Sequence, residues 1–230
     1  MSRAMPSNLR ALATDYDGTL AHHGTVLDST LQALRTLKGA SFKLVLVTGR
    51  ELTELQSVFP QLDWCDLAVV ENGGVIFNPA TGSIETLADP PAPAFIQRLQ
   101  AMSVPLQMGK TIVATWEPHE QEVLAAIKDL GLELQVIFNK GAVMILPGGV
   151  NKATGLKAAL KQMGLQPAEV AGIGDAENDH AFLEICGYAV AVDNALPTLK
   201  EKADLVTGGG HGNGVAELIQ RMITSTEVPK

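Results

Sequence analysis

A short apolar segment, residues 9–14, runs directly into the acidic stretch Asp15-Tyr16-Asp17-Gly18-Thr19-Leu20. A brief apolar run that ends abruptly in polar residues is typical of a buried parallel strand. Two carboxylates one residue apart, followed by a glycine, then lie where this strand leaves the sheet. The stretch therefore predicts the first strand of a parallel sheet, with a polar site at its end.

The alternation of strand and helix continues after this stretch. Helical spacing covers residues 29–37, and the apolar run 43–47 ends at Thr48-Gly49-Arg50. A second helix is expected over 51–59 and a third strand over 66–70. Alternating strands and helices predict an α/β fold with a parallel sheet and right-handed crossovers.

The pattern changes between residues 79 and 147. This region contains a proline-rich stretch, two helix-like segments (94–102 and 120–130) and several segments of alternating polarity. Such a mixture is typical of a separate α+β unit. We therefore expect an inserted α+β domain over 79–147 and an α/β core formed by 1–78 and 148–230.

The α/β rhythm resumes after the insertion. The expected elements are a helix at 152–163, a strand at 170–173 that ends at Gly174-Asp175, a helix at 177–185, strands at 188–192 and 204–207, and helices at 196–202 and from Val215 onward. The glycine-rich run 208–214 lacks the Lys-Ser/Thr ending of a phosphate-binding P-loop. We interpret it as a flexible loop that leads into the last helix.

Composition limits the classes of function. The 230 residues carry a net charge of -8, which argues against general affinity for nucleic acid or an anionic membrane. No apolar run reaches the roughly 18 residues that span a bilayer, so we expect a cytoplasmic protein. Cys65 and Cys186 are too few for a disulfide framework or a multi-thiolate zinc site. We interpret them as buried thiols.

Several polar residues are each predicted to follow a strand or to begin a helix: Asp15 with Asp17, Thr48, Lys152, and Asp175 with Asp179. Open α/β sheets bind their ligands outside the carboxyl ends of the strands. These residues are therefore expected to meet at one edge of the sheet.

Asp15 and Asp17 suit two roles in phosphate chemistry. An ionised carboxylate attacks phosphorus and forms an aspartyl-phosphate, which divides one difficult displacement into two easier ones. A second carboxyl group protonates the leaving oxygen and then activates water. We predict Asp15 as the nucleophile and Asp17 as the acid and base of a phosphate monoester hydrolase.

An anion that attacks an anion needs its charge neutralised, and Mg²⁺ with oxygen ligands is suited to this. Asp15 and Asp175 come from separate strands and would bind the ion. Asp179 would bind it directly or orient a water molecule on it.

The phosphoryl oxygens also need hydrogen-bond donors. Thr48 offers a hydroxyl, and Gly49 offers a backbone N–H at a helix start, where anions are favoured. Lys152 supplies a positive charge near another helix start. Asn178 is a further candidate donor.

The motifs resemble, in order and spacing, the four motifs of the haloacid dehalogenase-like hydrolases. They are Asp15-Tyr16-Asp17-Gly18-Thr19, Val47-Thr48-Gly49-Arg50, Lys152, and Gly174-Asp175-Ala176-Glu177-Asn178-Asp179. The resemblance spans nearly the whole chain outside the insertion. It implies a Rossmann-like core with a cap domain, and an insertion at this point is similar to the type IIB cap of Cof-type phosphatases.

Within that group the chain most resembles archaeal-type phosphoglycolate phosphatases, with sucrose-phosphate and mannosyl-3-phosphoglycerate phosphatases as neighbours. The resemblance implies magnesium at Asp15, Asp17, Asp175 and Asp179, and substrate at Lys152. The expected partner is therefore a small phosphorylated metabolite, phosphoglycolate or a sugar phosphate. The protein itself is expected to be a monomer or a homodimer.

Two other functions stay open. A phosphomutase or phosphotransferase on sugar phosphates would keep an aspartate at the position of Asp17. A signalling module would carry a long-lived phosphate on Asp15, as receiver domains do, but receiver domains lack an insertion between strands.

The site residues taken singly also have structural explanations. These are a solvated turn for Asp15 and Asp17, helix caps for Thr48 and Asp175, a surface position for Lys152, and a structural helix position for Asp179 and Asn178. We interpret His22 and His23 as loop residues, although both follow the predicted nucleophile. Asn72, after the third strand, would reach the substrate.

Overall fold

The buried apolar runs form the central sheet of the structure, which is a computed structural model that describes residues 3–227. Its strand order is β12 (Leu205–Val206), β11 (Tyr188–Ala191), β10 (Val170–Gly174), β1 (Ala11–Thr14), β2 (Lys43–Val47), β3 (Leu67–Val70), β4 (Val75–Asn78) and β5 (Ser83–Thr86). The strands from β12 to β3 are parallel, and β4 and β5 are antiparallel. The α/β fold expected from the strand and helix pattern is therefore confirmed.

The register of the three central strands aligns their carboxyl ends. Thr14 at the end of β1 pairs with Ile173 on β10 and with Leu46 on β2. The residues that follow each strand are therefore neighbours in space. They are Asp15, Asp175 and Thr48, so the expected convergence at one sheet edge follows directly from the pairing.

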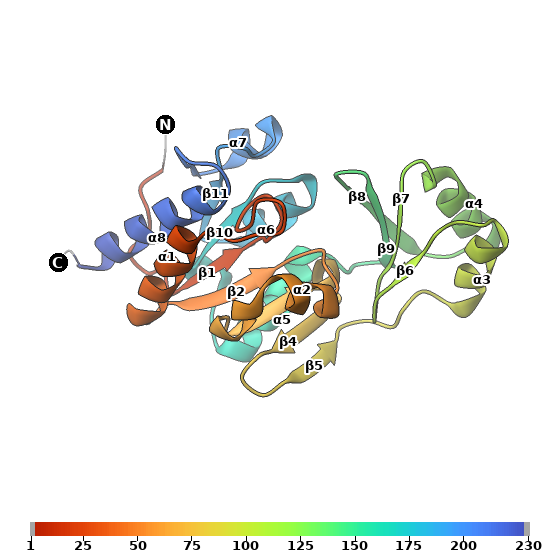
Figure 1. Ribbon diagram of the computed structural model, residues 1–230, viewed down its shortest axis with the longest axis horizontal. Coiled ribbons are helices and arrows are strands. Elements are labelled where there is room, and N and C mark those ends of the chain that lie inside the picture. The colour runs from red at the N-terminus through yellow and green to blue at the C-terminus, as the bar shows by residue number, and fades with distance from the viewer. Residues whose placement is uncertain (1–2, 228–230) are drawn as a thin grey trace.

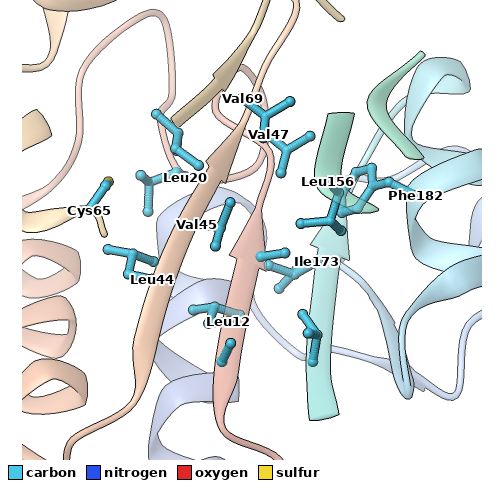
Figure 2. Packing of buried hydrophobic residues seen from close by; sticks show 14 of the residues in the cluster. Leu12, Leu20, Leu44, Val45, Val47, Cys65, Val69, Leu156, Ile173 and Phe182 are labelled. Carbon is cyan, nitrogen blue, oxygen red and sulfur yellow. The ribbon is translucent and has the colours of Figure 1, made fainter. Parts of the chain in front are cut away.

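Helices cover both faces of this sheet. They are α1 (Asp28–Gly39), α2 (Leu52–Val58), α5 (Lys152–Met163), α6 (His180–Ile185), α7 (Pro197–Lys202) and α8 (His211–Glu227). α5 packs on β2, β3 and β4, and α6 packs on β10 and β11. α1 and α8 lie side by side (Figure 1). Figure 2 shows Leu12, Val45 and Ile173 from the central strands packed in the core with Leu156 of α5.

A second, antiparallel sheet has the order β6 (Gln107–Met108), β7 (Val113–Trp116), β9 (Ala142–Pro147) and β8 (Leu134–Asn139). The helices α3 (Pro93–Ala101) and α4 (Glu120–Leu130) pack on it around their own apolar cluster, which includes Phe95 and Val143. Figure 1 shows these helices on the side of the sheet away from the larger one. The opposite side of the small sheet, with Met144 and Leu146, faces the core.

The structure differs from the expected start of the insertion at residue 79. β5 pairs with β4, so residues 83–86 extend the large sheet rather than the small one. The sequence pattern missed this strand because all four of its residues are exposed, and no apolar alternation marks it. The α+β unit of the insertion therefore begins after this hairpin.

The interpretation of 208–214 as a loop is also wrong in its second half, because α8 already begins at His211. A Cβ atom at Gly212 would lie 2.4 Å from Thr30 Oγ1. The glycine thus allows the first turn of α8 to approach α1 closely. A related difference concerns 177–185, where a 3-10 turn (Glu177–Asp179) precedes α6.

Both cysteines are free thiols, with Cys65 buried and Cys186 partly buried. Burial raises the pKa of each thiol to about 12, so neither is a reactive thiolate at neutral pH. Within residues 3–227, no helix is long and apolar enough to cross a membrane.

Candidate active site

The loop after β1 turns sharply at Gly18, which has a φ of 92°. A Cβ atom at this position would lie 2.3 Å from Asp175 Oδ2, so only glycine allows the loop to pass this carboxylate. The backbone N–H of Asp15 donates to Ile173 O on the neighbouring strand at 3.0 Å. The loop therefore holds Asp15 against the end of β10.

Lys152 is the central cation of the site. It is only 2% exposed, and its Nζ donates to Asp15 Oδ1 and to Asp179 Oδ1, each at 2.6 Å. Burial lowers the pKa of Lys152, but the carboxylates of Asp15 and Asp179 outweigh this and raise it above its ordinary value. The structure thus rules out a surface position for Lys152.

The start of α5 places Lys152 at this point. Asn151 Oδ1 accepts hydrogen bonds from the N–H groups of Ala153 and Thr154, and Thr154 Oγ1 accepts one from Asn151 N. This reciprocal capping box fixes the first turn of the helix. Lys152 is the first residue of that turn, so the cap determines where the ammonium group begins its reach into the site.

Asp179 holds the loop that follows β10. Its Oδ2 accepts hydrogen bonds from the backbone N–H groups of Asp175 at 2.8 Å and Ala176 at 2.9 Å. Its other oxygen bonds Lys152, and the residue is fully buried. Asp179 therefore joins the loop of Asp175 to the ammonium group of Lys152.

Asp175 is held from two sides. Thr19 Oγ1 donates to its Oδ1 at 3.0 Å, and Lys140 Nζ donates to its Oδ2 at 2.9 Å. Lys140 also donates to the main-chain oxygen of Asp17 at 3.0 Å. Sequence reasoning missed Lys140, because it lies in the turn between β8 and β9 of the insertion, far along the chain from the motifs.

The carboxylates of Asp15, Asp175 and Asp179 form one buried group, in which each offers an oxygen within 4.8 Å of the others. Burial and the neighbouring Asp179 raise the pKa of Asp15 to about 8, although Lys152 opposes the shift. Carboxylate oxygens at this spacing are the donor set that a hard divalent cation prefers. The donor set therefore fits a metal ion.

The side chain of Asp17 lies outside this group. Arg50 binds it through two hydrogen bonds, from Nε to Oδ2 at 2.6 Å and from Nη2 to Oδ1 at 2.8 Å. Arg50 also pairs with Glu54 one helical turn later. In the structure, the main-chain oxygen of Asp17 therefore points toward the carboxylates, and its side chain points toward Arg50. The sequence interpretation gave Arg50 no role.

A cavity of about 230 Å³ opens beside Asp15 and lies between the two sheets. Its lining from the large sheet includes Asp15, Asp17, Thr48, Gly49 and Arg50, and its lining from the small sheet includes Ile112, Ala114, Trp116, Asn139 and Met144. Thr48 is buried and its Oγ1 accepts from Arg50 N. Since the residue before α2 is Glu51, Thr48 does not cap that helix.

Asn178 does not line this cavity. Its Nδ2 donates to Asn72 Oδ1 at 2.9 Å, and its own Oδ1 is buried without a partner among the described residues. Asn72 in turn donates to Met144 Sδ on β9. Both asparagines line a separate hollow that also touches Lys152. They therefore lie beside the buried cluster but outside the cavity of Asp15.

His22 and His23 are exposed and do not line the cavity of Asp15. The ring of His22 stacks on that of His211, with 4.2 Å between their centroids. A ring nitrogen of His211 lies 2.9 Å from Gly18 O, and Asn194 donates to the same oxygen. This arrangement agrees with loop residues that support the turn at Gly18.

Comparison with known protein families gives a match over the part of the chain that contains these site residues. A family model described as haloacid dehalogenase-like hydrolase matches residues 12–106 and 95–219. Together with the doubly wound sheet and the aspartate cluster at its edge, this match identifies a hydrolase built on an α/β core. The chain belongs to the haloacid dehalogenase-like hydrolases, and the resemblance expected from the four motifs is confirmed.

Individual relatives match over nearly the full chain. A phosphoglycolate phosphatase of Methanothermobacter thermautotrophicus is 31% identical, with 94% of this chain and 99% of the relative covered. Phosphoglycolate phosphatase 2 of Saccharolobus solfataricus is 29% identical, with 95% and 94% covered. These relatives agree with the expected similarity to archaeal-type enzymes.

Solved structures share the fold. A haloacid dehalogenase-like hydrolase from Bacteroides thetaiotaomicron superposes with a TM-score of 0.78 at 19% identity, over 93% of this chain and 99% of that chain. A HAD subclass IIB sugar phosphatase gives a TM-score of 0.76 at 18% identity, over 92% and 98%. The arrangement of a core sheet and an inserted α+β unit is therefore shared with solved members of the family.

Proposed function

We propose that this protein is a magnesium-dependent phosphatase that hydrolyses a small phosphate monoester through an aspartyl-phosphate on Asp15. The observation that carries the proposal is the buried cluster of Asp15, Lys152 and Asp179 beside Asp175, with Asp15 also lining the cavity between the two sheets. The relatives called phosphoglycolate phosphatase support phosphoglycolate as the first candidate substrate.

We propose that the carboxylates of Asp15 and Asp175 and the main-chain oxygen of Asp17 bind Mg²⁺, with Asp179 completing the buried group. Support comes from Lys140, whose ammonium group already lies between Asp17 O and Asp175 Oδ2. These oxygens thus accept a cation. When bound, the ion would neutralise the charge on the phosphoryl group during attack by a carboxylate.

Asp15 performs the first step in this proposal. Its Oδ1 is held by Lys152, which leaves Oδ2 for attack on phosphorus. The new bond from Asp15 to phosphorus forms as the bond between phosphorus and the ester oxygen breaks. Asp17 donates a proton to the departing oxygen, so the alcohol leaves neutral.

Asp17 also serves the second step. As a carboxylate it takes a proton from water, whose oxygen attacks phosphorus and breaks its bond to Asp15, so inorganic phosphate leaves and Asp15 is restored. Arg50 holds both oxygens of Asp17 in the present geometry. Each oxygen keeps a second lone pair at which Asp17 can take up a proton, so Arg50 orients the carboxylate and acts as a positioning residue for it.

Thr48, Gly49 and Lys152 are the proposed donors to the phosphoryl oxygens. Thr48 and Gly49 line the cavity beside Asp15, and Lys152 contacts Asp15 directly. Asn178 is a weaker candidate, because its amide group bonds Asn72 outside this cavity. The small sheet would act as a cap that limits water and selects the leaving group.

A panel of phosphate esters tests the proposal. The purified protein should release inorganic phosphate from phosphoglycolate, and to a lesser degree from sugar phosphates, in the presence of Mg²⁺. Chelation with EDTA should stop the release, and added Mg²⁺ should restore it. Isomerised or transferred phosphate without free phosphate would favour a phosphomutase instead. A stable phosphoprotein would favour a signalling module.

Substitution of Asp17 by asparagine should slow the enzyme in a way that depends on the leaving group. Loss of a general acid typically costs about 10² to 10⁴ in rate. We expect kcat/KM to fall far more for phosphoglycolate, whose alkoxide leaves poorly, than for p-nitrophenyl phosphate, whose phenolate leaves readily. Equal losses for the two esters would remove Asp17 as the acid of the first step.

A further inference from the structure

Lys140 links the small sheet to the proposed metal site. It lies in the turn between β8 and β9, with a left-handed backbone at φ 50°. Its side chain places Nζ 3.0 Å from Asp17 O and 2.9 Å from Asp175 Oδ2, at the edge of the large sheet. The side chain of Asp175 is buried, whereas that of Lys140 is 51% exposed. Because the side chain of Lys140 is already half in solvent, its ammonium group can move from Asp175 into water without being buried elsewhere.

A second link between the two sheets is of a different kind. Glu71, at the end of β3, is buried, and its carboxylate accepts hydrogen bonds from the N–H groups of Lys110, Thr111 and Ile112 and from Thr111 Oγ1, at 2.8 to 3.2 Å. These donors form the turn between β6 and β7. Four hydrogen bonds to one buried carboxylate make this link a fixed one, because separation would leave the charge without partners.

Charge balance favours a divalent ion over Lys140 at the first link. In their ionised forms, the three carboxylates of the buried cluster exceed the single positive charge of Lys152, which pairs with Asp15 and Asp179, by two. Lys140 offsets only part of the remaining negative charge, whereas a divalent cation offsets all of it. Both cations need the same two oxygens, Asp17 O and Asp175 Oδ2. Two positive charges that share these oxygens would lie within a few ångströms of each other and repel strongly. They therefore exclude one another.

We propose that Lys140 and the divalent cation compete for Asp17 O and Asp175 Oδ2, so that metal binding releases the β8–β9 turn from the core while Glu71 keeps the β6–β7 turn attached. The inference rests on the metal site of the proposed function and adds a conformational consequence to it. The cap would pivot near Glu71, and the cavity would open on the side of Lys140 when the cation binds.

Amine labelling of the native protein tests the release directly. The wild type is treated with an acetylating reagent with and without Mg²⁺, and the rate at each lysine is followed by mass spectrometry. We expect Mg²⁺ to raise the rate at Lys140 several-fold. Lys128 is the internal control, because it is exposed on α4, away from the core, and should not respond. An unchanged or lower rate at Lys140 would overturn the inference.

Calorimetric titration with Mg²⁺ tests the competition independently. Lys140→Met removes the competing ammonium group and should bind Mg²⁺ several-fold more tightly than the matched variant Lys128→Met, which loses the same charge from the same sheet unit. Equal affinities would overturn the inference. Neither measurement needs turnover. If Mg²⁺ binds but Lys140 does not respond, this inference fails alone, and if the wild type binds no Mg²⁺, the proposed metal site fails with it.

Discussion

Replacement of Asp15 by asparagine is expected to abolish release of phosphate from both phosphoglycolate and p-nitrophenyl phosphate in the presence of Mg²⁺. An amide does not attack phosphorus as a carboxylate does, so the aspartyl-phosphate cannot form. Loss of a covalent nucleophile typically costs at least about 10⁴ in turnover. The measurement is the rate of phosphate release at saturating substrate.

The folded state should survive this substitution. Asparagine has the shape of aspartate, and its Oδ1 can still accept the hydrogen bond from Lys152. Burial and Asp179 raise the pKa of Asp15 to about 8, so the ionised form is disfavoured in the folded protein and its contribution to stability falls as pH rises through that value. A neutral amide has no such penalty, and we expect no loss of thermal stability at pH 8.

A matched control separates chemistry from general damage. Asp129 pairs with Arg98 on the exposed surface of the small sheet unit, so Asp129→Asn removes a carboxylate far from the cluster. This variant should keep wild-type turnover, since an exposed ion pair contributes little to stability. If Asp15→Asn turns over as fast as Asp129→Asn, Asp15 is not the nucleophile.

The core of the site could be predicted because it depends on strand ends. Asp15, Asp175 and Thr48 follow three adjacent parallel strands, and parallel pairing leaves little freedom in where such residues meet. Lys152 and Asp179 could be placed with them because each lies at or near the start of a helix that follows a strand. Local apolar patterns were enough to define these elements.

Contacts between the two sheets could not be predicted from local patterns. Lys140 contacts Asp175 from the turn of one hairpin, and Glu71 accepts hydrogen bonds from the turn of another. Neither contact leaves a periodic signal in the sequence. Asn139-Lys140-Gly141 reads only as hairpin turn chemistry. Arg50 was visible in its motif, but nothing local shows that its side chain turns back to Asp17.

The buried charges also explain why the site is tied so closely to the fold. Removing several carboxylates from water is unfavourable unless cations and hydrogen bonds compensate for the loss of hydration. Here Lys152 joins Asp15 to Asp179, and Asp179 in turn bonds the backbone next to Asp175. The same contacts thus satisfy the buried charges and fix the geometry that we propose for catalysis.

Replacement of Lys152 by methionine is therefore expected to reduce both stability and turnover. Methionine fills a similar volume but leaves the carboxylates of Asp15 and Asp179 buried without their shared cation. Removal of one partner from a buried ion pair costs about 3 to 5 kcal/mol. Phosphate release should fall by about 10² to 10³, the loss typical when one preorganised electrostatic group is removed.

The test is the free energy of unfolding in urea, measured for Lys152→Met and for the control variant Lys161→Met. Lys161 is a matched control because it lies on the same helix but is exposed. Lys161→Met should change the free energy of unfolding by no more than about 0.5 kcal/mol. The defect of Lys152→Met should shrink as pH falls, because protonation of the raised-pKa carboxyl of Asp15 removes the unpaired charge. Saturating Mg²⁺ should also offset part of it by supplying positive charge to the same carboxylates. Equal stability of the two variants at pH 9, where the carboxyl of Asp15 is ionised in the wild type, would show that Lys152 does not compensate the buried acids.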